Sequence, residues 1–291
     1  MAPTIDIIKF SKKLLIANKE SIICGWSLIK QHALKNKTEL IPIDSEHFSI
    51  FKLLENQNRN EIEKIYITAS GGPFLNHKIK QLNKITPKEA LKHPKWNMGK
   101  KISIDSSTLM NKIFEFIEAQ KLFDLPCDKL DILIHPESLV HAIIVLKNGL
   151  TKFIYHNTSM IIPIANAIFG SQFNIKDYYN VSRLNKKKDI EIKNLTFLKV
   201  NKKIFPPITI KKEVNKYPSS SIIINACNEI LVDQFLKKNI PFLRIFKTIN
   251  TIMNDRNYKK YAIRRPKNLN QINTIDLWAR KITLNKIKQY A

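Results

Sequence analysis

Polar side chains recur at helical spacing in an otherwise apolar segment, residues 100–123 (KKISIDSSTLMNKIFEFIEAQKLF). Thr108, Asn111, Lys112 and Glu115 are three or four positions apart, so one face of a helix would carry all four. The residues around them are mostly apolar, as in a buried helix. A buried carboxylate is costly unless it is paired or bound to a metal. Glu115 is therefore either a metal ligand or the partner of Lys112 in a buried ion pair.

Two more carboxylates, Asp44 and Glu46, lie where a predicted strand at residues 37–44 ends. There both can turn toward one cation, and oxygen ligands of this kind suit Mg²⁺ or Mn²⁺. A solvated acidic turn is the alternative interpretation of this pair alone. A third carboxylate, Glu115, favours the metal site.

The start of the same helix predicts an anion site next to the metal. We expect a strand at the beginning of the segment, with Asp105 and Ser106 capping the helix that follows it. Because a helix N-terminus attracts anions, Ser106, Asn111 and Lys112 are placed to bind a phosphate. The metal would then lie one turn further along the helix.

Two loops supply further candidates. The turn at residues 70–73 (SGGP) closes a predicted strand, and its glycines either let the backbone approach a ligand or only make a turn. The loop-rich stretch at residues 86–101 either closes over a ligand or packs as a small cluster of its own. Its candidate residues are His93, Trp96, Met98 and Gly99. His135 and His141 lie in an apolar strand pattern and are interpreted as core histidines.

Strands and helices must alternate to position these side chains. Up to about residue 170 the pattern predicts an α/β fold, with an α+β catalytic domain built on a mixed sheet. Asn148-Gly149 predicts a hairpin turn. Residues 171–204 are polar and irregular, and a C-terminal helical domain follows. Residues 12–21 predict a short buried strand that leads into a helix of about a dozen residues ending near Lys35. The other predicted strands are at 37–44, 64–70, 131–146 and 151–157, and the other predicted helices are at 48–56, 106–123, 219–239, 241–257 and 274–289.

The composition is that of a globular protein with a strong positive charge. The 291 residues carry a formal net charge of +25, but the lysines are spread along the chain, with one run of three at 186–188 and scattered pairs such as 211–212. This distribution argues against a nucleic-acid partner and favours attraction of small anions. We expect no membrane span and no signal peptide. The three scattered cysteines predict reduced thiols in the cytoplasm.

Taken together, these segments resemble the 1-deoxy-D-xylulose 5-phosphate reductoisomerases. The similarity runs in order through LIANKES, IPIDSEH, SGGPF, HPKWNMGKKISIDSSTLMNK, LIHPES and INACNEI, and covers nearly the whole chain. It implies an enzyme of the non-mevalonate isoprenoid pathway, in which a phosphorylated ketose rearranges and is reduced to 2-C-methyl-D-erythritol 4-phosphate. The implied cofactors are NADPH and Mn²⁺ or Mg²⁺, with Co²⁺ as an alternative ion, and the implied assembly is a homodimer.

The resemblance also implies roles for single residues. The implied metal ligands are Asp44, Glu46 and Glu115. The implied phosphate-binding residues are Ser70, Ser106, Asn111 and Lys112, with His93 also in the substrate site. Lys19 and Ser45 would contact the rest of the substrate, as would Glu46 and Glu115 through the metal. Trp96 and Met98 would form a flap, and the implied NADPH contacts are Asn18, Glu20, Met98 and Gly99. The implied catalytic residues are Lys19, Glu46, His93 and Trp96.

The sequence departs from the family pattern in two places. Met160 is present, but the acidic residue and the Arg usual around it are replaced in NTSMIIPI, residues 157–164. The six glycines, at 25, 71, 72, 99, 149 and 170, form no glycine-rich turn for the NADPH pyrophosphate. We therefore expect residues 1–44 to be a remnant of a Rossmann-like domain. A catalytic domain (45–180), a linker (181–204) and the helical domain (205–291) would follow.

Three interpretations remain open at this point. The chain is an incomplete reductoisomerase or one half of a split enzyme that a separate N-terminal half completes. Alternatively, it is a non-redox protein that binds a metal and a sugar phosphate, or a basic nucleic-acid-associated protein. The retained carboxylates and phosphate-binding residues favour the first interpretation.

Overall fold

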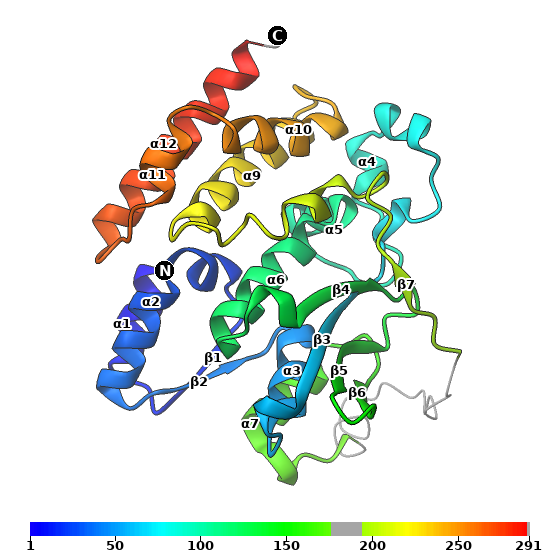
Figure 1. Ribbon diagram of the computed structural model, residues 1–291, viewed down its shortest axis with the longest axis vertical. Coiled ribbons are helices and arrows are strands. Elements are labelled where there is room, and N and C mark those ends of the chain that lie inside the picture. The colour runs from blue at the N-terminus through cyan, green and yellow to red at the C-terminus, as the bar shows by residue number, and fades with distance from the viewer. Residues whose placement is uncertain (176–193, 290–291) are drawn as a thin grey trace.

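The computed structural model describes residues 1–175 and 194–289 (Figure 1). Residues 181–193 of the predicted linker, including the lysine run at 186–188, lie outside the described residues. A membrane-spanning helix needs about 20 apolar residues, and the described part of the chain contains no helix that meets this requirement.

A five-stranded sheet of order β6-β5-β3-β4-β7 forms the centre of the fold (Figure 1). Its strands are β3 (Ile62–Ala69), β4 (Leu130–Ile134), β5 (Val140–Leu146), β6 (Thr151–Tyr155) and β7 (Leu198–Lys199). β3 pairs with β4 in parallel, whereas the other neighbours are antiparallel. Ile65 and Ile67 are buried and alternate with half-buried Lys64 and Tyr66, as in a strand with one well-covered face. The predicted mixed α/β fold is confirmed.

The predicted hairpin is confirmed too. β5 and β6 are joined by a tight turn in which Gly149 has a φ of 87°, a conformation that glycine adopts without strain. β7 was not predicted, because it lies in the polar stretch after residue 171.

The N-terminal part forms a smaller unit of strand, helix and strand. It contains α1 (Ala2–Ile8), β1 (Lys13–Ile16), α2 (Lys19–Asn36) and β2 (Glu39–Pro42). β1 and β2 pair in parallel and α2 connects them. The Asn18 side chain accepts a hydrogen bond from the Ser21 amide and so caps α2. The predicted order of elements in residues 12–44 is therefore confirmed.

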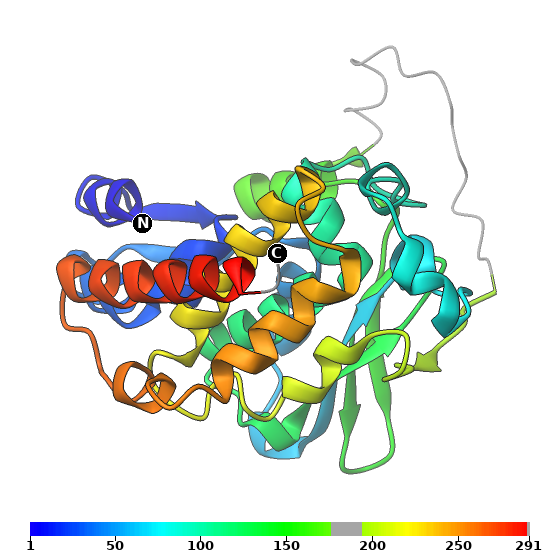
Figure 2. The same cartoon turned by 90° about the horizontal axis from the view of Figure 1, so that it is seen from above.

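Helices surround both units. The α-helices are α3 (Ser45–Leu54), α4 (Pro87–Ala90), α5 (Lys100–Thr108), α6 (Met110–Phe123), α7 (Ile161–Phe169), α9 (Ser220–Leu236), α10 (Phe242–Met253), α11 (Tyr258–Ala262) and α12 (Leu269–Lys288). Short 3₁₀ turns are η1 (Arg59–Glu61), η2 (Gly72–Phe74), η3 (Ile79–Lys84), η4 (Cys127–Lys129), η5 (Gly170–Gln172) and η6 (Pro206–Ile210). α3 and α6 pack against the sheet, while α9 packs against α2, α5, α10 and α12 (Figure 2).

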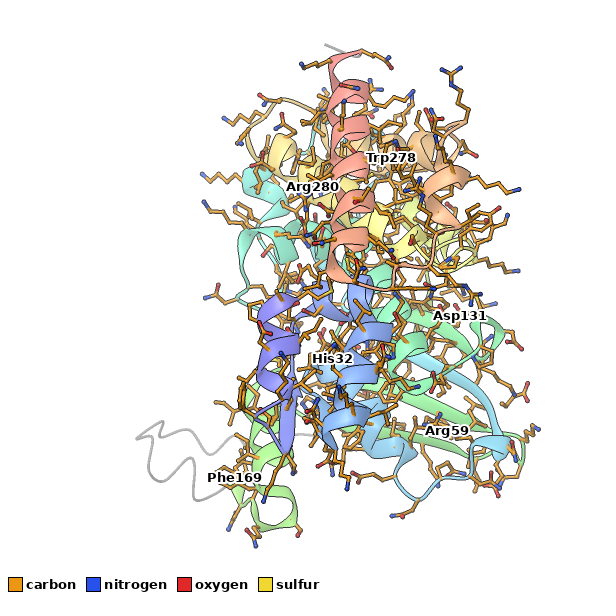
Figure 3. The ribbon with its side chains drawn as sticks, turned by 90° about the vertical axis from the view of Figure 1, so that its left-hand side faces the viewer. His32, Arg59, Asp131, Phe169, Trp278 and Arg280 are labelled. Atoms are coloured by element: carbon orange, nitrogen blue, oxygen red, sulfur yellow. The ribbon has the colours of Figure 1, made fainter. Side chains whose placement is uncertain are left out.

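One continuous apolar core joins these layers. Ile65 of the sheet, Phe116 of α6, Phe235 of α9 and Ile275 of α12 all belong to the same buried cluster. Side-chain contacts with neighbouring elements also hold α12 in place (Figure 3). There Trp278 stacks on Tyr261 with 4.2 Å between ring centroids, and Arg280 forms an ion pair with Glu229 of α9. The predicted helical character of the C-terminal part is confirmed.

The strand predicted at the start of residues 100–123 is wrong. Residues 100–108 form the helix α5, which ends at Leu109 in a left-handed conformation (φ 69°) before α6 begins. Its buried hydroxyls are satisfied inside the helix, because Ser103, Ser107 and Thr108 donate to the preceding carbonyls of Gly99, Ile104 and Asp105. The short alternation KISIDS therefore lies in a helix packed against α6 and α9.

This break changes two details of the predicted polar face. Thr108 ends α5 and its hydroxyl donates to the Asp105 carbonyl, so the face on α6 consists of Asn111, Lys112 and Glu115. Asp105 and Ser106 lie in the last turns of α5 and do not cap the helix that carries Glu115. The sequence pattern was read as one helix because nothing in it marks the left-handed Leu109.

A half-buried lysine, Lys121, joins α2, α6 and α9. The Lys121 ammonium donates to the Ile23 carbonyl at 2.5 Å and to the Ser221 hydroxyl at 2.9 Å. Burial lowers the pKa of Lys121 from 10.5 to about 8, although the charges of Cys24 and Glu118 act in the opposite direction. Between these pH values the unfolded chain binds more protons than the folded one, so stability should rise with pH.

We expect the free energy of unfolding of the wild type to rise by about 2 kcal/mol between pH 7 and 10 relative to that of Lys121→Met. Each pKa unit is worth about 1.4 kcal/mol, and water reaches part of the side chain. Urea denaturation of both proteins across this range measures the difference. Parallel pH profiles would show that Lys121 has the same pKa in the folded and unfolded chain.

Candidate active site

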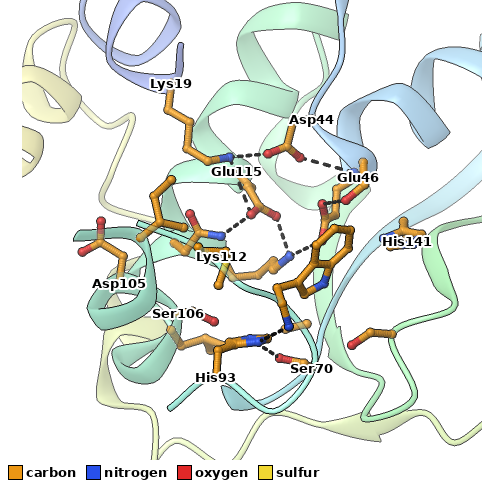
Figure 4. Close-up of a pocket in the computed structure, with 18 of the residues that line it drawn as sticks. Lys19, Asp44, Glu46, Ser70, His93, Asp105, Ser106, Lys112, Glu115 and His141 are labelled. Atoms are coloured by element: carbon orange, nitrogen blue, oxygen red, sulfur yellow. Dashed lines mark hydrogen bonds and ion pairs between the residues drawn. The ribbon is translucent and has the colours of Figure 1, made fainter. Parts of the chain in front are cut away.

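A cavity of about 490 Å³ lies between α2, α3, the end of β3, α5, α6 and the loop that precedes α5 (Figure 4). The structure brings the predicted site residues together around it, although they come from distant parts of the sequence. Those that line the cavity are Asn18, Lys19, Glu20, Asp44, Ser45, Glu46, Ser70, His93, Trp96, Met98, Ser106, Asn111, Lys112 and Glu115. Gly99 does not line it but directly follows Met98.

Three carboxylates gather at one end of the cavity. One oxygen each of Asp44, Glu46 and Glu115 lies within 4.8 Å of the other two. Asp44 is the N-cap of α3 and accepts a hydrogen bond from the Glu46 amide, so the helix start directs both side chains to the same point. Glu115 reaches them from α6 and is 1% exposed. This donor set fits a hard divalent cation.

Two ammonium groups lie among these carboxylates. Lys19 is 2.6 Å from Asp44 Oδ2 and 3.6 Å from Glu115 Oε1, and Lys112 is 2.8 Å from Glu46 Oε1 and 2.5 Å from Glu115 Oε2 (Figure 4). The ion pair between Lys112 and Glu115 that the sequence suggested is therefore present within the carboxylate cluster.

Burial and charge together set the protonation of the cluster. Burial, followed by the charge of Glu46, raises the pKa of Glu115 to about 8, although Lys112 and Lys19 oppose the shift. Burial opposes ionisation of Asp44 as well, but the charge of Lys19 outweighs it and holds the pKa of Asp44 well below its usual range. Burial by itself would lower the pKa of Lys19, yet the nearby carboxylates raise it well above its ordinary value.

Ser70 and His93 form a second polar group in the cavity. His93 Nδ1 accepts hydrogen bonds from the amides of Trp96 (2.9 Å) and Lys95 (3.2 Å), so in the neutral ring Nε2 carries the proton. That Nε2–H donates to Ser70 Oγ at 3.1 Å, and Ser70 Oγ also accepts from the Gly72 amide. Ser70 is therefore left with its own hydroxyl proton to donate to a ligand. Burial, followed by the positive charge of Lys112, lowers the pKa of His93 to about 4 and keeps the ring neutral.

The glycines after β3 bring this group close to α5. Gly72 has a φ of 59°, and a Cβ on it would lie 3.1 Å from the Ser106 carbonyl oxygen. The SGGP turn therefore lies close to the backbone of α5 at Ser106. It sets the turn against the helix whose Ser106 side chain lines the cavity.

Asn18, Glu20 and Met98 line another part of the cavity wall. Glu20 is 3.4 Å from Lys101, which in turn contacts Asp105 at 3.1 Å. Gly99 is the N-cap of α5, and a Cβ on it would meet nothing within 4 Å. The backbone at Gly99 therefore borders open space.

Sequence reasoning missed several residues of the cavity wall, and two of them have a buried polar atom to which no described residue forms a hydrogen bond. His141, interpreted as a core histidine, lines the cavity, and its buried Nε2 has no hydrogen-bond partner among the described residues. Ser138 lines the cavity as well, and its buried hydroxyl also has no hydrogen-bond partner in the described part of the chain. Burial lowers the pKa of His141 to about 4. The LIHPESLVH sequence contained the signal, because polar residues follow directly after a strand there.

Aromatic rings cover this side of the cavity. The His141 ring stacks on His156 at 4.1 Å and meets the Trp96 ring edge-on at 6.2 Å between centroids. His156 precedes the segment that departs from the family pattern, and within that segment Met160 still lines the cavity. Trp96 and Met98 lie in a loop without regular structure between α4 and α5, as expected for a flap.

A mixed α/β fold with a carboxylate cluster in a pocket is typical of metal-dependent enzymes. The particular family follows from the comparisons. Residues 40–123 match the 1-deoxy-D-xylulose 5-phosphate reductoisomerase C-terminal domain, and residues 156–282 match the DXP reductoisomerase C-terminal domain. The chain belongs to the 1-deoxy-D-xylulose 5-phosphate reductoisomerase family.

Full-length relatives agree with this assignment. The reductoisomerase of Pelagibacter ubique is 48% identical over 281 residues, which are 95% of this chain and 70% of that protein. The reductoisomerase of the Wolbachia of Brugia malayi is 39% identical over an alignment of 292 positions, which covers 99% of this chain and 72% of that protein. The chain thus spans about seven tenths of the length of these two relatives.

Solved structures show the same fold. A crystal structure of DOX-P reductoisomerase in complex with NADPH, fosmidomycin and magnesium has a TM-score of 0.86 and 31% identity, over 98% of this chain and 72% of that one. The enzyme of Zymomonas mobilis in complex with NADPH has a TM-score of 0.83 and 30% identity, over 98% of this chain and 71% of that one.

Proposed function

We propose that this chain provides the metal- and phosphate-binding part of a 1-deoxy-D-xylulose 5-phosphate reductoisomerase. One observation carries the proposal: a single cavity holds the clustered oxygens of Asp44, Glu46 and Glu115 together with the donors of Ser70 and Lys112. A site for a phosphorylated ketose needs two features: an electrophilic cation at the substrate carbonyl and hydrogen-bond donors at the substrate phosphate.

The carboxylate cluster is the proposed site of Mg²⁺, with Mn²⁺ as an alternative for the same oxygen ligands. When bound there, the ion supplies a Lewis acid that polarises the substrate carbonyl. The chain's own residues prepare the site, because Lys19 and Lys112 hold the three carboxylates in place. Ser45, whose hydroxyl donates to Glu46 Oε2 at 2.6 Å, fixes the orientation of that ligand.

Ser70, Ser106, Asn111 and Lys112 are the proposed phosphate-binding residues. The hydroxyl proton of Ser70 is free for a phosphate oxygen because the neutral His93 ring and the Gly72 amide supply its other hydrogen bonds. Lys112 adds the charge that makes such a hydrogen bond strong. Holding the phosphate far from the reacting carbons orients the carbonyl end toward Lys19 and Glu46.

NADPH is the proposed reductant, with Asn18, Glu20, Met98 and Gly99 on its side of the cavity. The open space at Gly99 fits the approach of a ligand to the start of α5. The indole of Trp96, packed edge-on against His141, would close over the substrate and exclude water from the reacting carbonyl. The homodimer, the separate N-terminal half and the domain limits at 44, 180 and 204 remain predictions from the sequence.

Oxidation of NADPH, followed by absorbance with 1-deoxy-D-xylulose 5-phosphate and Mg²⁺, tests the proposal. We expect no turnover by this chain alone, because its glycines form no phosphate-binding turn. Turnover is expected when the N-terminal NADPH-binding half of a relative is added.

Substantial turnover by the chain alone would contradict the expected need for that half. No turnover in the mixture, with metal and sugar phosphate still bound, would favour a non-redox binder.

A further inference from the structure

Lys19 is surrounded by carboxylates from two sides of the cavity. Its ammonium is 2.6 Å from Asp44 Oδ2, 3.3 Å from Glu118 Oε2 and 3.6 Å from Glu115 Oε1. Asp44 and Glu115 belong to the proposed metal-binding cluster. Glu118 does not, since the group of clustered oxygens comprises only Asp44, Glu46 and Glu115 among the described residues. Glu118 is 1% exposed, and nothing in its sequence surroundings predicts a role for it.

The charges of this region balance only when Glu118 is included. Metal ligands bind in their deprotonated form, so with a cation present Asp44, Glu46 and Glu115 are counted as ionised, although burial raises the pKa of Glu115 in the absence of the cation. Together with an ionised Glu118 they supply four negative charges, and Lys19 and Lys112 supply two positive ones. Two negative charges remain, which is the amount that one divalent cation neutralises. Without the negative charge of Glu118, the site with its cation would carry one unbalanced positive charge, and an uncompensated buried charge is costly.

Lys19 also competes with a cation for its ligands. In the absence of metal its closest partner is Asp44, so a cation that binds Asp44 and Glu115 must share them with this ammonium. Glu118 offers Lys19 a partner that the cation does not use. It lies about one turn after Glu115 and therefore on the same face of α6.

We propose that Glu118 is a positioning residue that holds Lys19 and balances its charge when a divalent cation occupies Asp44, Glu46 and Glu115. The inference rests on the proposed function of this cluster as a metal site. Glu118 keeps the ammonium beside the substrate carbonyl and away from the cation. The alternative is a merely structural ion pair between α2 and α6, which would change stability without changing metal affinity.

A double-mutant cycle on Mg²⁺ affinity, measured by titration calorimetry, separates these roles. The proteins are the wild type, Glu118→Gln, Lys19→Met and the double variant. We expect Glu118→Gln to weaken Mg²⁺ binding about tenfold in the wild type, because Lys19 then holds Asp44 more tightly. In the Lys19→Met background the same change should alter affinity less than about twofold, since a buried carboxyl without an ammonium partner is already neutral.

Two further variants complete the test. Glu118→Asp keeps the charge and should restore the affinity to within about threefold of the wild type. Glu63→Gln, on the exposed side of β3, is the matched control and should leave it unchanged. Thermal melts of each variant show that the fold is retained.

Unchanged Mg²⁺ affinity in Glu118→Gln, or an equal loss in both Lys19 backgrounds, would overturn the positioning role and leave the proposed function standing. A wild type that binds no Mg²⁺ would overturn the proposed metal site itself, and the inference with it.

Discussion

Replacing Glu115 by Gln is expected to weaken Mg²⁺ binding at least about a hundredfold. Changes to residues that only support metal ligands already cost about 10- to 100-fold, and this change removes one of the three clustered carboxylates. It also leaves the Lys112 ammonium with Glu46 as its one remaining ion-pair partner among the described residues. That unbalanced positive charge opposes a cation at the same place.

Titration calorimetry with Mg²⁺ and with Mn²⁺ measures the loss. Glu63→Gln is again the matched control, because it makes the same chemical change on an exposed strand position. An unchanged affinity in Glu115→Gln would mean that this carboxylate is no ligand and only neutralises Lys112.

Lys112→Ala and Ser106→Ala should both weaken the binding of a phosphonate substrate analogue, and Lys112→Ala the more strongly. Hydrogen bonds to charged groups are worth about 1.5–3 kcal/mol and neutral ones about 0.5–1.5 kcal/mol. We therefore expect losses of about 10- to 100-fold for Lys112 and about 3- to 10-fold for Ser106.

Lys112 also bridges Glu46 and Glu115, so its removal frees these carboxylates for a cation but also takes away a positive charge that favours the ionised form of Glu115. Mg²⁺ affinity should therefore change much less than phosphonate affinity. Calorimetry with each ligand separately distinguishes the two effects. A non-phosphorylated ketose is the control ligand. If its binding weakened as much as that of the phosphonate, Lys112 and Ser106 would not be phosphate-binding residues.

Much of the fold could be predicted from periodicity alone. The strand–helix–strand order of residues 12–44 and the hairpin at Asn148-Gly149 have strong local signals, and both are confirmed. The C-terminal helices were equally clear, because apolar residues recur there at helical spacing. The break at Leu109 was not predictable, since a leucine with positive φ has no sequence signature and is held by the packing around it.

The candidate site was recognised where residue type and spacing are local, as in Asp44-Ser45-Glu46 and in Asn111, Lys112 and Glu115. Side chains whose surroundings depend on distant segments were missed. His141 looked like a core residue because its own strand is apolar, and only the meeting with Trp96 and His156 places it at the cavity. Glu118 has no local sequence signal, because Lys19 is 99 positions away in the sequence and lies beside it only in the folded chain.

The left-handed Leu109 also determines how far apart the two proposed binding groups lie. On the proposed assignment, Ser106 at the end of α5 holds the phosphate and Glu115 on α6 holds the metal, and one residue joins the two helices. A leucine in this conformation costs about 1–2 kcal/mol, and its 1% exposure shows that tight packing maintains it. The conformation of Leu109 thus sets the relative direction of the two helices. On that assignment, the spacing between Ser106 and Glu115 limits the length of a sugar phosphate that can reach both groups.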